Sequence, residues 1–569
     1  MGSESPNSST ISRRGVLKGG ALAAVTGVSG LGINRSVNAR PAKSHSTNKD
    51  PVRAGSNVAI AETKAGKIAG YLGGGIYAFK GVPYAASPEG ANRFLPARKP
   101  TPWTGVRSSR QFGVICPQDK GNGRLHDEEA FIFRWNDSVE GEDCLRVNVW
   151  TPGLRDNGRR PVMVWLHGGG FEAGSGHDLP AFDGENLARR GDVVVVTLNH
   201  RLNLLGYLDL SAYGEQYASS GNIGMLDIVT ALEWVRDNIA EFGGDPRRVL
   251  IFGQSGGGAK VGTLMGMPAA RGLFHRAIVE SGSFTLTSTR DKSQKLAALL
   301  LAELGLGPGD VRKLHELPYA ELQRAGAAAM LKANGPFDII NFKTLQKRLI
   351  YGPVVDGHVL PELPFGEAAP AISADVPMMV GTTLNELVTA TDHPEYERMT
   401  RAELAAKVDV LFPSRATEII SVFEQRAPGA KPFDLWSRIA ASPIREAAIR
   451  QAKLKAAQNA ASAYLYWFTW QTPIFDGRPG AFHCAEIPFA FANAEQCDYW
   501  TGGGPRAKAL GDRVADAWIH FARKGNPSHP GIPAWAPFSP QAAPSMIFDD
   551  EVRLELNPDG AEQAVIKSG

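Results

Sequence analysis

The sequence GQSGG at residues 253–257 most constrains the fold, because it directly follows the apolar run at residues 249–252. An apolar run of this length predicts a buried strand, and the small residues after it allow a tight turn into a helix. Turns of this kind hold a serine in strained backbone geometry at the end of a sheet, where it is accessible to substrate. We therefore predict that Ser255 is a nucleophile.

A second motif, HGGGF at residues 167–171, follows another apolar run at residues 162–166. Three successive glycines leave backbone N–H groups uncovered, and acyl transfer needs such donors around its tetrahedral oxyanion. The alternative is a loop that is merely flexible. The strand before it and the serine turn downstream favour an oxyanion hole.

Other motifs along the chain appear in the order of a known family. They are FKGVPY at 79–84, EDCL at 142–145, NHRL at 199–202, GNIG at 221–224, FGGDP at 242–246, ESGS at 280–283, VDG at 355–357, NE at 385–386, GAFH at 480–483 and FARKGNP at 521–527. With the two glycine-rich motifs, they make residues 55–555 resemble the type B carboxylesterases, the cholinesterase-like branch of the α/β hydrolases. The resemblance implies an α/β-hydrolase fold: a large, mostly parallel central sheet, helices on both faces and inserted helical lid or gorge segments.

The chain order in this fold is serine, acid, histidine, so the general base must lie downstream of Ser255. The stretch around His483 resembles the family's histidine loop, and we assign the base to it. His520 falls in an apolar periodic run, where a packed or surface histidine is expected, and His529 lies in a proline-rich loop.

The acid that orients the histidine is assigned to Glu386, which follows a strand-like segment at residues 376–381 and matches the family's glutamate. The rival is Asp356, but its VDG motif resembles a structural segment of the family. The resemblance also implies that the N–H of Gly256 joins those of Gly169 and Gly170 in the oxyanion hole. It further implies that the Ser281 hydroxyl supports the triad by hydrogen bonding.

Two residues beside the nucleophile depart from the family pattern, in which glutamate precedes the serine and alanine follows it. Gln254 removes a negative charge next to the site, which disfavours quaternary ammonium substrates. Gly256 loosens the turn but keeps its N–H.

Lys260 stands at the wrong spacing for a Ser/Lys catalytic pair, which would require lysine where Gly258 stands. We therefore interpret Lys260 as structural.

The N-terminus carries the sequence SRRGVLK at residues 12–18, an uncharged run at 19–33 and small residues at 37–39. This pattern resembles a bacterial twin-arginine export signal. The run has 15 residues, fewer than the roughly 20 that span a bilayer. We expect a signal peptide at residues 1–39, a flexible mature N-terminus at 40–54, no stable membrane anchor, and a periplasmic or secreted enzyme.

The formal net charge of +3 is carried by that leader, so the rest of the chain is balanced. Neither a basic face nor a nucleic-acid-binding motif is evident, and no nucleic-acid partner is expected. Residues 127–143 are locally acidic, as in a solvated loop or an entrance that disfavours anions.

Four cysteines suit an exported protein. The family resemblance implies a disulfide between Cys116 and Cys144, and Trp135, in the segment between them, is a candidate for the gorge entrance. Cys484 and Cys497 form either a second bridge or two free thiols. The sequence contains no zinc-type Cys/His spacing and no phosphate-binding glycine fingerprint, so we expect neither metal nor cofactor.

No linker or repeat divides residues 55–560, which we interpret as one domain despite their length. Strands are expected at residues 162–166, 193–198 and 249–252, and an amphipathic helix at 225–241. Residues 284–350 are rich in helix formers and predict an inserted helical lid or gorge wall that selects substrates.

These observations predict a serine hydrolase that cleaves small to medium carboxylic esters through an acyl-enzyme. One alternative is a specialised hydrolase of amides, carbamates or xenobiotic esters, which would use the same machinery. Another is a noncatalytic adhesion or binding protein, which the presence of all three triad residues disfavours.

Overall fold

The computed structural model describes residues 51–567, except residues 120, 122–124, 137, 284–286 and 336–347. The expected signal segment lies outside the described residues. Residues Lys49–Gly569 form one compact unit, and the description below concerns that unit alone.

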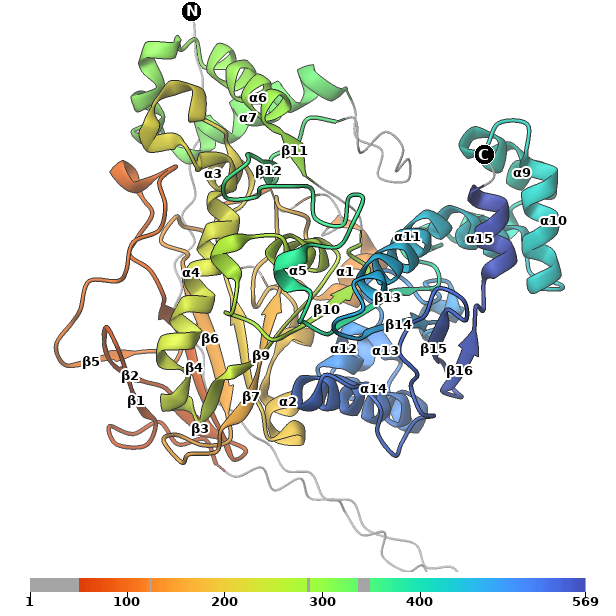
Figure 1. Ribbon diagram of the computed structural model, residues 1–569, viewed down its shortest axis with the longest axis horizontal. Coiled ribbons are helices and arrows are strands. Elements are labelled where there is room, and N and C mark those ends of the chain that lie inside the picture. Colours follow the sequence, from red (N-terminus) through yellow and green to blue (C-terminus); the bar gives the residue numbers. More distant parts are fainter. Residues whose placement is uncertain are drawn as a thin grey trace, which may run out of the picture. The chain divides into compact units, whose positions relative to one another are not determined.

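A large mixed sheet forms the centre of the described residues (Figure 1). In spatial order its strands are β16 (Arg553–Leu556), β15 (Pro544–Phe548), β14 (Ala463–Phe468), β13 (Met378–Thr383), β10 (Arg276–Glu280), β9 (Gly244–Gln254), β7 (Arg160–Leu166), β8 (Val194–Leu198), β6 (Arg146–Thr151), β4 (Ile76–Pro83) and β3 (Tyr71–Gly73). The strands from β15 to β8 run parallel, and antiparallel strands complete both edges. This architecture confirms the expected fold class.

Helices cover the two faces of this sheet. Those of the described residues are α1 (Asp127–Phe133), α2 (Glu185–Gly191), α3 (Asn203–Tyr207), α4 (Ile223–Asn238), α5 (Gly256–Met265), α6 (Arg290–Glu303), α7 (Tyr319–Asn334), α9 (Arg401–Leu411), α10 (Ala416–Arg426), α11 (Pro432–Ala457), α12 (Ile487–Ala490), α13 (Asp498–Thr501), α14 (Gly504–Lys524) and α15 (Gly560–Lys567). Short strands β1 (Ile60–Thr63), β2 (Gly66–Ala69) and β5 (Val106–Ser108) form a separate sheet, as do β11 (Ser288–Thr289) and β12 (Val354–Val355).

Alternation along β7 shows how the sequence fills both faces. Val162, Val164 and Leu166 pack in the core that contains α4, α5 and part of α11, whereas Met163 and Trp165 pack against α2, α12 and α14. Successive strand side chains point to opposite faces, and a parallel sheet covered on both sides must be apolar on both. The continuous apolar runs of the sequence therefore became central strands.

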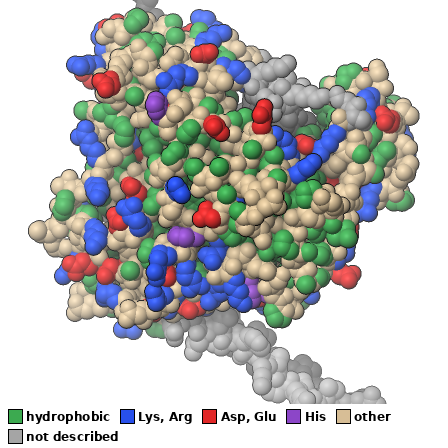
Figure 2. All heavy atoms as spheres, viewed as in Figure 1, with side chains coloured by type: hydrophobic (Ala, Val, Ile, Leu, Met, Phe, Trp, Pro, Cys, Tyr) green, Lys and Arg blue, Asp and Glu red, His purple; other side chains and the backbone are tan. Residues whose placement is uncertain are grey.

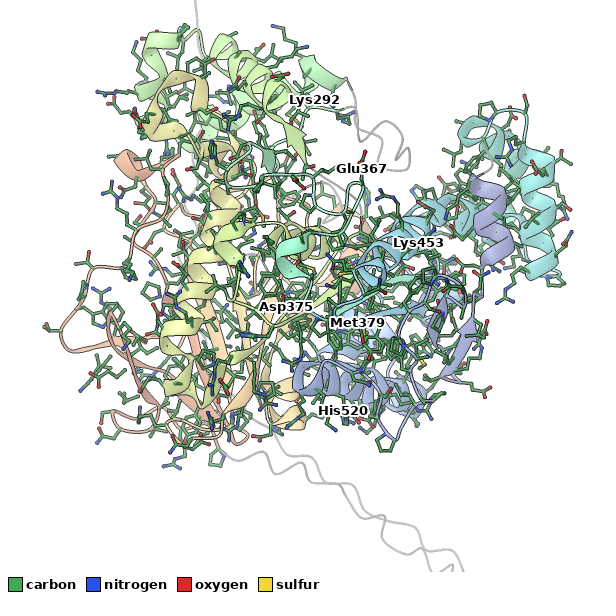
Figure 3. The ribbon with its side chains drawn as sticks, viewed as in Figure 1. Lys292, Glu367, Asp375, Met379, Lys453 and His520 are labelled. Atoms are coloured by element: carbon green, nitrogen blue, oxygen red, sulfur yellow. The ribbon has the colours of Figure 1, made fainter. Side chains whose placement is uncertain are left out.

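Helix α11 shows the same division between a packed side and an exposed one. Its Ala448 and Ala452 are buried in the core, whereas Lys453 is exposed, and Met379 of the neighbouring strand β13 is fully buried (Figure 3). The start of α11 also packs with α9, α10 and α15 around a third core cluster, which the sequence patterns did not indicate. These helices stand together on one side of Figure 1.

The expected elements agree with the structure in type and differ at their ends. The helix expected at residues 225–241 is α4, which passes into a 3₁₀ turn at Ile239–Phe242. The strand expected at 249–252 is longer on both sides, because β9 pairs with β7 and β10 along its length. The described part of residues 284–350 is largely helical, with α6 and α7 packed against each other.

Charged side chains of both signs are interspersed on the face that Figure 2 shows. Some join elements, as Arg190 of α2 does through its ion pairs with Asp512 and Asp516 of α14. Within the described residues, no helix combines the length and the apolar character that a membrane span requires.

Candidate active site

Ser255 occupies the turn between β9 and α5, with φ 57° and ψ −124°. A non-glycine residue rarely adopts a positive φ, and here the surrounding sheet enforces it. The Ser255 N–H donates to the carbonyl of Glu280 on β10 at 2.8 Å. A Cβ on Gly257 would lie 1.9 Å from the Leu166 carbonyl oxygen, so only glycine allows α5 to approach β7 this closely.

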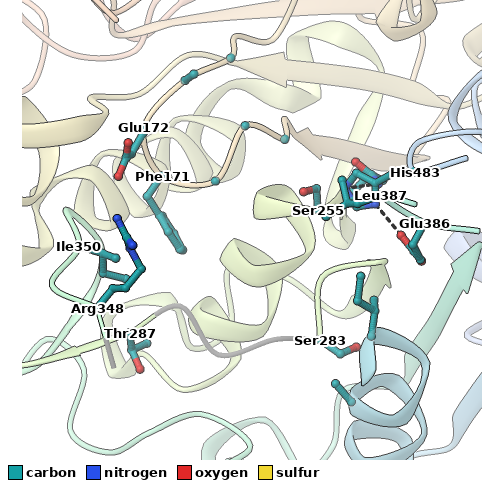
Figure 4. Close-up of a pocket in the computed structure, with 18 of the residues that line it drawn as sticks. Phe171, Glu172, Ser255, Ser283, Thr287, Arg348, Ile350, Glu386, Leu387 and His483 are labelled. Atoms are coloured by element: carbon teal, nitrogen blue, oxygen red, sulfur yellow. Dashed lines mark hydrogen bonds and ion pairs between the residues drawn. The ribbon is translucent and has the colours of Figure 1, made fainter. Parts of the chain in front are cut away.

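The structure brings His483 and Glu386 together in direct contact. His483 Nδ1 donates to Glu386 Oε2 at 2.5 Å, and the His483 backbone N–H donates to the Glu386 carbonyl at 2.8 Å. Figure 4 shows Ser255 and Glu386 on opposite sides of the His483 ring. This order is the one that a serine, base and acid relay requires.

Glu386 is held by more than its histidine. Its other oxygen, Oε1, accepts hydrogen bonds from the Thr383 N–H and from the Ser281 hydroxyl, both at 2.8 Å. The side chain is 1% exposed. Because both carboxylate oxygens have donors, the buried charge is satisfied and the imidazole is fixed with its proton on Nδ1.

The side chain of Gln254 contacts the opposite nitrogen of the histidine. Gln254 Nε2 lies 3.2 Å from His483 Nε2, and Gln254 Oε1 accepts from the Cys484 thiol at 3.0 Å. Among the described residues, Ser255 Oγ makes no hydrogen bond. In this structure, therefore, the amide contacts the ring nitrogen that Glu386 does not bind. The sequence motifs indicated no contact between Gln254 and His483; the only signal was the departure from the family's glutamate.

The glycine loop lies over Ser255. A Cβ on Gly168 would be 3.6 Å from Ser255 Cβ, and a Cβ on Gly256 would be 2.3 Å from the Gly170 carbonyl oxygen. The N–H groups of Gly169, Gly170 and Gly256 have no acceptor among the described residues. Three donors that lack partners, close to a serine side chain, suit a developing oxyanion.

A cavity of about 2560 Å³ opens at Ser255 and His483. The glycine loop, Trp135 and residues of α7 are part of its lining, as are Lys292 of α6 and Glu367 of the segment after β12 (Figure 3). Trp135 stacks on Phe133 with ring centroids 5.0 Å apart. The inserted helices thus contribute to the walls, as the sequence predicted for a gorge.

The other candidates for the acid and the base are engaged elsewhere. Asp356 accepts from Asn222 Nδ2 at 2.9 Å and from the backbone N–H groups of His358 and Leu360. His520 lies on α14 (Figure 3). His529 lies beyond that helix and makes a hydrogen bond with the carbonyl of Arg513, a residue of α14. None of these residues lines the cavity.

All four cysteines are free thiols, so the expected bond between Cys116 and Cys144 is not formed in this structure. The two thiols are buried side by side: the hydrogen bond with Cys116, together with burial, raises the pKa of the Cys144 thiol well above its usual value. Cys484 and Cys497 bind different partners, Gln254 and Tyr499.

One group of side chains in the lining of the cavity offers possible metal ligands within the described part of the chain: His126, Glu129 and Asp392. The Asp392 carboxylate already accepts the backbone N–H groups of Glu128 and Glu129 at 2.9 and 3.0 Å. These contacts account for its position at the start of α1 without an ion.

Comparisons with known proteins agree with this geometry. The Carboxylesterase family matches residues 57–425. The para-nitrobenzyl esterase of Bacillus subtilis (strain 168) is 34% identical over 508 residues, covering 89% of this chain and 97% of that protein. The phenmedipham hydrolase of Pseudarthrobacter oxydans is 34% identical over 517 residues, with coverages of 89% and 96%.

Solved structures of esterases are also similar to this chain. An esterase from the anaerobe Clostridium hathewayi, described as able to hydrolyse aliphatic aromatic polyesters, superposes with a TM-score of 0.78 at 37% identity. The match covers 91% of this chain and 99% of that one. The chain therefore belongs to the carboxylesterase family and is a carboxylic ester hydrolase with the α/β-hydrolase fold.

Proposed function

We propose that ester hydrolysis proceeds through a covalent acyl-enzyme on Ser255. His483 Nε2 takes the proton of Ser255 Oγ while that oxygen bonds to the ester carbonyl carbon. The resulting oxyanion accepts hydrogen bonds from the N–H groups of Gly169, Gly170 and Gly256. His483 then gives its proton to the alkoxide leaving group, and the carbon–oxygen bond of the ester breaks.

Deacylation uses the same groups with water in place of serine. His483 takes a proton from water, whose oxygen attacks the acyl carbon, and returns it to Ser255 Oγ as the acid leaves. Glu386 stabilises the imidazolium in both halves and keeps Nε2 available as the base. The observation that carries this proposal is the 2.5 Å contact between Glu386 and His483, with Ser255 across the ring.

Small to medium carboxylic esters are the proposed substrates. The cavity volume also favours a second candidate class, bulky xenobiotic esters or carbamates, because about 2560 Å³ exceeds the volume of an ordinary small-molecule site, which is about 300–1,000 Å³. Phenmedipham hydrolase, one of the relatives, by its name hydrolyses phenmedipham. The acyl-enzyme chemistry would serve either class, and the fit of the groups around Ser255 would decide between them.

The test is hydrolysis of p-nitrophenyl esters from acetate to palmitate, and of an aryl carbamate, by residues 40–569. Ser255→Ala and His483→Ala, each checked for folding by circular dichroism, serve as controls. We expect turnover that both substitutions abolish, with a chain-length profile that sizes the acyl pocket. A folded wild-type protein that turns over none of these substrates would instead favour the noncatalytic binding alternative.

We also propose export through the twin-arginine route, on the basis of the leader sequence SRRGVLK. In a bacterial host, Arg13→Lys combined with Arg14→Lys should retain activity in the cytoplasm, whereas Arg35→Lys should leave export unchanged. Equal export of both forms would contradict the proposal.

In an oxidising compartment we propose that Cys116 and Cys144 pair, each thiol losing a proton and one electron to a disulfide oxidant such as oxidised glutathione. Alkylation of free thiols followed by mass spectrometry should then find two fewer alkylated cysteines in the exported protein than in protein purified from the cytoplasm. An identical thiol count in the two preparations would exclude the bond.

A further inference from the structure

Lys260 lies on α5, five residues after the nucleophile, and its side chain is fully buried. Its Nζ donates to the carbonyl oxygens of His167 at 3.0 Å and Gly170 at 2.7 Å. No carboxylate in the described part of the chain forms an ion pair with it. Burial lowers the pKa of Lys260 to about 7, which shows that this position disfavours the charge. Because burying an ammonium group without a carboxylate partner is unfavourable, the two carbonyl contacts of Lys260 indicate a specific role.

The two carbonyls that Lys260 binds are the ends of the glycine loop. Between them, the Gly168 carbonyl accepts from His167 Nδ1 at 2.9 Å, and the Gly169 carbonyl accepts from the Ala173 N–H at 3.0 Å. Four successive carbonyls of the loop are therefore bound. In a planar trans peptide the carbonyl of one residue points opposite to the N–H of the next. The bonds to the Gly168 and Gly169 carbonyls therefore orient the Gly169 and Gly170 N–H groups, and the two Lys260 bonds hold the peptides on either side of them.

The missing side chain at residue 256 belongs to the same arrangement. Gly256 leaves room for Gly170 to approach within the space that a Cβ would fill. Lys260, one helical turn further along α5, then binds the carbonyl of that same Gly170. Helix α5 thus provides both the space beside Gly256 that Gly170 occupies and the Lys260 donor that binds the Gly170 carbonyl.

We propose that Lys260 is a positioning residue for the oxyanion hole, holding both ends of the glycine loop so that the Gly169 and Gly170 N–H groups face the oxyanion. This inference rests on the acyl-enzyme mechanism at Ser255. It assigns Lys260 no contact with substrate. Because the oxyanion exists only during the reaction, Lys260 should affect kcat rather than substrate affinity.

The chain offers a matched control in Lys455 of α11. This lysine is also 0% exposed, and its Nζ donates to the carbonyl oxygens of Ser373 and Ala374 at 2.9 and 2.8 Å. Burial lowers the pKa of Lys455 as well, to about 8. It does not line the cavity. Replacing it measures what losing a buried, carbonyl-bound lysine does to the fold alone.

The experiment compares Lys260→Met with Lys455→Met, which keep an unbranched side chain one atom shorter and remove the donors. We would measure kcat and KM on p-nitrophenyl butyrate, Tm, and the inhibition constant of a trifluoromethyl ketone, whose adduct with Ser255 carries an oxyanion. For Lys260→Met we expect kcat to fall about 100-fold, as for loss of one oxyanion donor, with KM changed less than threefold. The inhibition constant should rise by the same factor as kcat/KM falls. Lys455→Met should lower Tm but leave kcat within twofold.

Folded Lys260→Met with kcat near wild type, or with a change confined to KM, would overturn the proposal. So would an inhibition constant that does not follow kcat/KM. Should Lys260→Met not fold, Lys260→Gln, which keeps an amide donor, takes its place. Failure of both Lys260 variants to fold while Lys455→Met folds would assign Lys260 a structural role only. Activity that survives Ser255→Ala would refute the acyl-enzyme mechanism itself, whatever Lys260 does.

Discussion

The two sides of Ser255 are held by different kinds of interaction. On the base side, hydrogen bonds between side chains join Ser281, Glu386, His483 and Gln254. On the oxyanion side, backbone groups of the glycine loop are held by carbonyl contacts, two of them from Lys260. The base side needs particular side chains, whereas the oxyanion side needs glycines, whose lack of a side chain leaves the backbone N–H groups uncovered. Substitutions should therefore damage the two sides by different mechanisms.

Glu386→Gln should have the largest effect, a fall in kcat of about 10⁴-fold. The Thr383 N–H and the Ser281 hydroxyl both donate to Oε1, so the amide oxygen of the new glutamine should stay there. Its NH₂ group would then face His483 Nδ1 and force the proton onto Nε2, which could no longer act as base. Steady-state kinetics check this. A loss below tenfold in a folded variant would show that Glu386 does not set the histidine tautomer.

Gly256→Ala should reduce kcat by about 10²-fold, although alanine is common at this position in the family. The added Cβ would lie 2.4 Å from Gly170 N and Cα, and these backbone atoms must move. Gly262→Ala on the same helix is the control, because its Cβ would meet only the end of the Gln451 side chain, at 3.3 Å. Equal activity of the two variants would show that the loop does not need its close approach to α5.

Ser281→Ala should lower kcat about tenfold, as expected for loss of one hydrogen bond to a charged group. Since Ser281 is proposed to act through Glu386, the loss should disappear when Glu386→Gln is already present. A double-mutant cycle measures this coupling. Additive losses would separate Ser281 from the triad.

Glu280→Gln should have the smallest effect on activity and a distinct effect on stability. Burial raises the pKa of Glu280 to about 8, although Trp518 Nε1 donates to it at 2.7 Å. Between its unfolded pKa, near 4.5, and 8, the folded state holds a proton that the unfolded state has lost. This residue's contribution to the free energy of unfolding therefore decreases as pH rises through that range.

Glutamine does not titrate, so it adds no pH dependence to the free energy of unfolding, and its amide oxygen keeps the acceptor for Trp518. The stability of Glu280→Gln relative to wild type should therefore increase with pH between 4.5 and 8, by at most about 1.4 kcal/mol per pH unit. Urea unfolding at several pH values measures it. Parallel stability curves for the two proteins would mean that Glu280 is not protonated in the fold.

Sequence motifs predicted the family, the fold class and the residues that the structure gathers around Ser255. They succeeded because a nucleophile, a base and an acid need specific side chains at recognisable turns, and because buried parallel strands need continuous apolar runs. Helix and strand ends were less well predicted. Strand β9 extends beyond its apolar run because pairing with β7 and β10, rather than hydrophobicity, determines where it ends.

The contacts of Gln254 and Lys260 could not be predicted in the same way. His483 is 229 residues from Gln254, and the Gly170 carbonyl is 90 residues from Lys260. A spacing rule that excludes Lys260 as a catalytic base does not reveal which carbonyls it binds. The pairing of Cys116 with Cys144 followed from family resemblance, whereas the structure shows adjacent free thiols.

The sequence by itself determined the chemistry available to this protein: a serine at a strained turn, a histidine and a glutamate in the right order, and glycines that uncover N–H groups. Only the tertiary structure decided the direction in which those N–H groups point and which side chains, Glu386 and Gln254, contact the histidine. The physical reason is that residue types limit which bonds can form, whereas hydrogen-bond partners and close backbone approaches depend on distances between segments far apart in the chain.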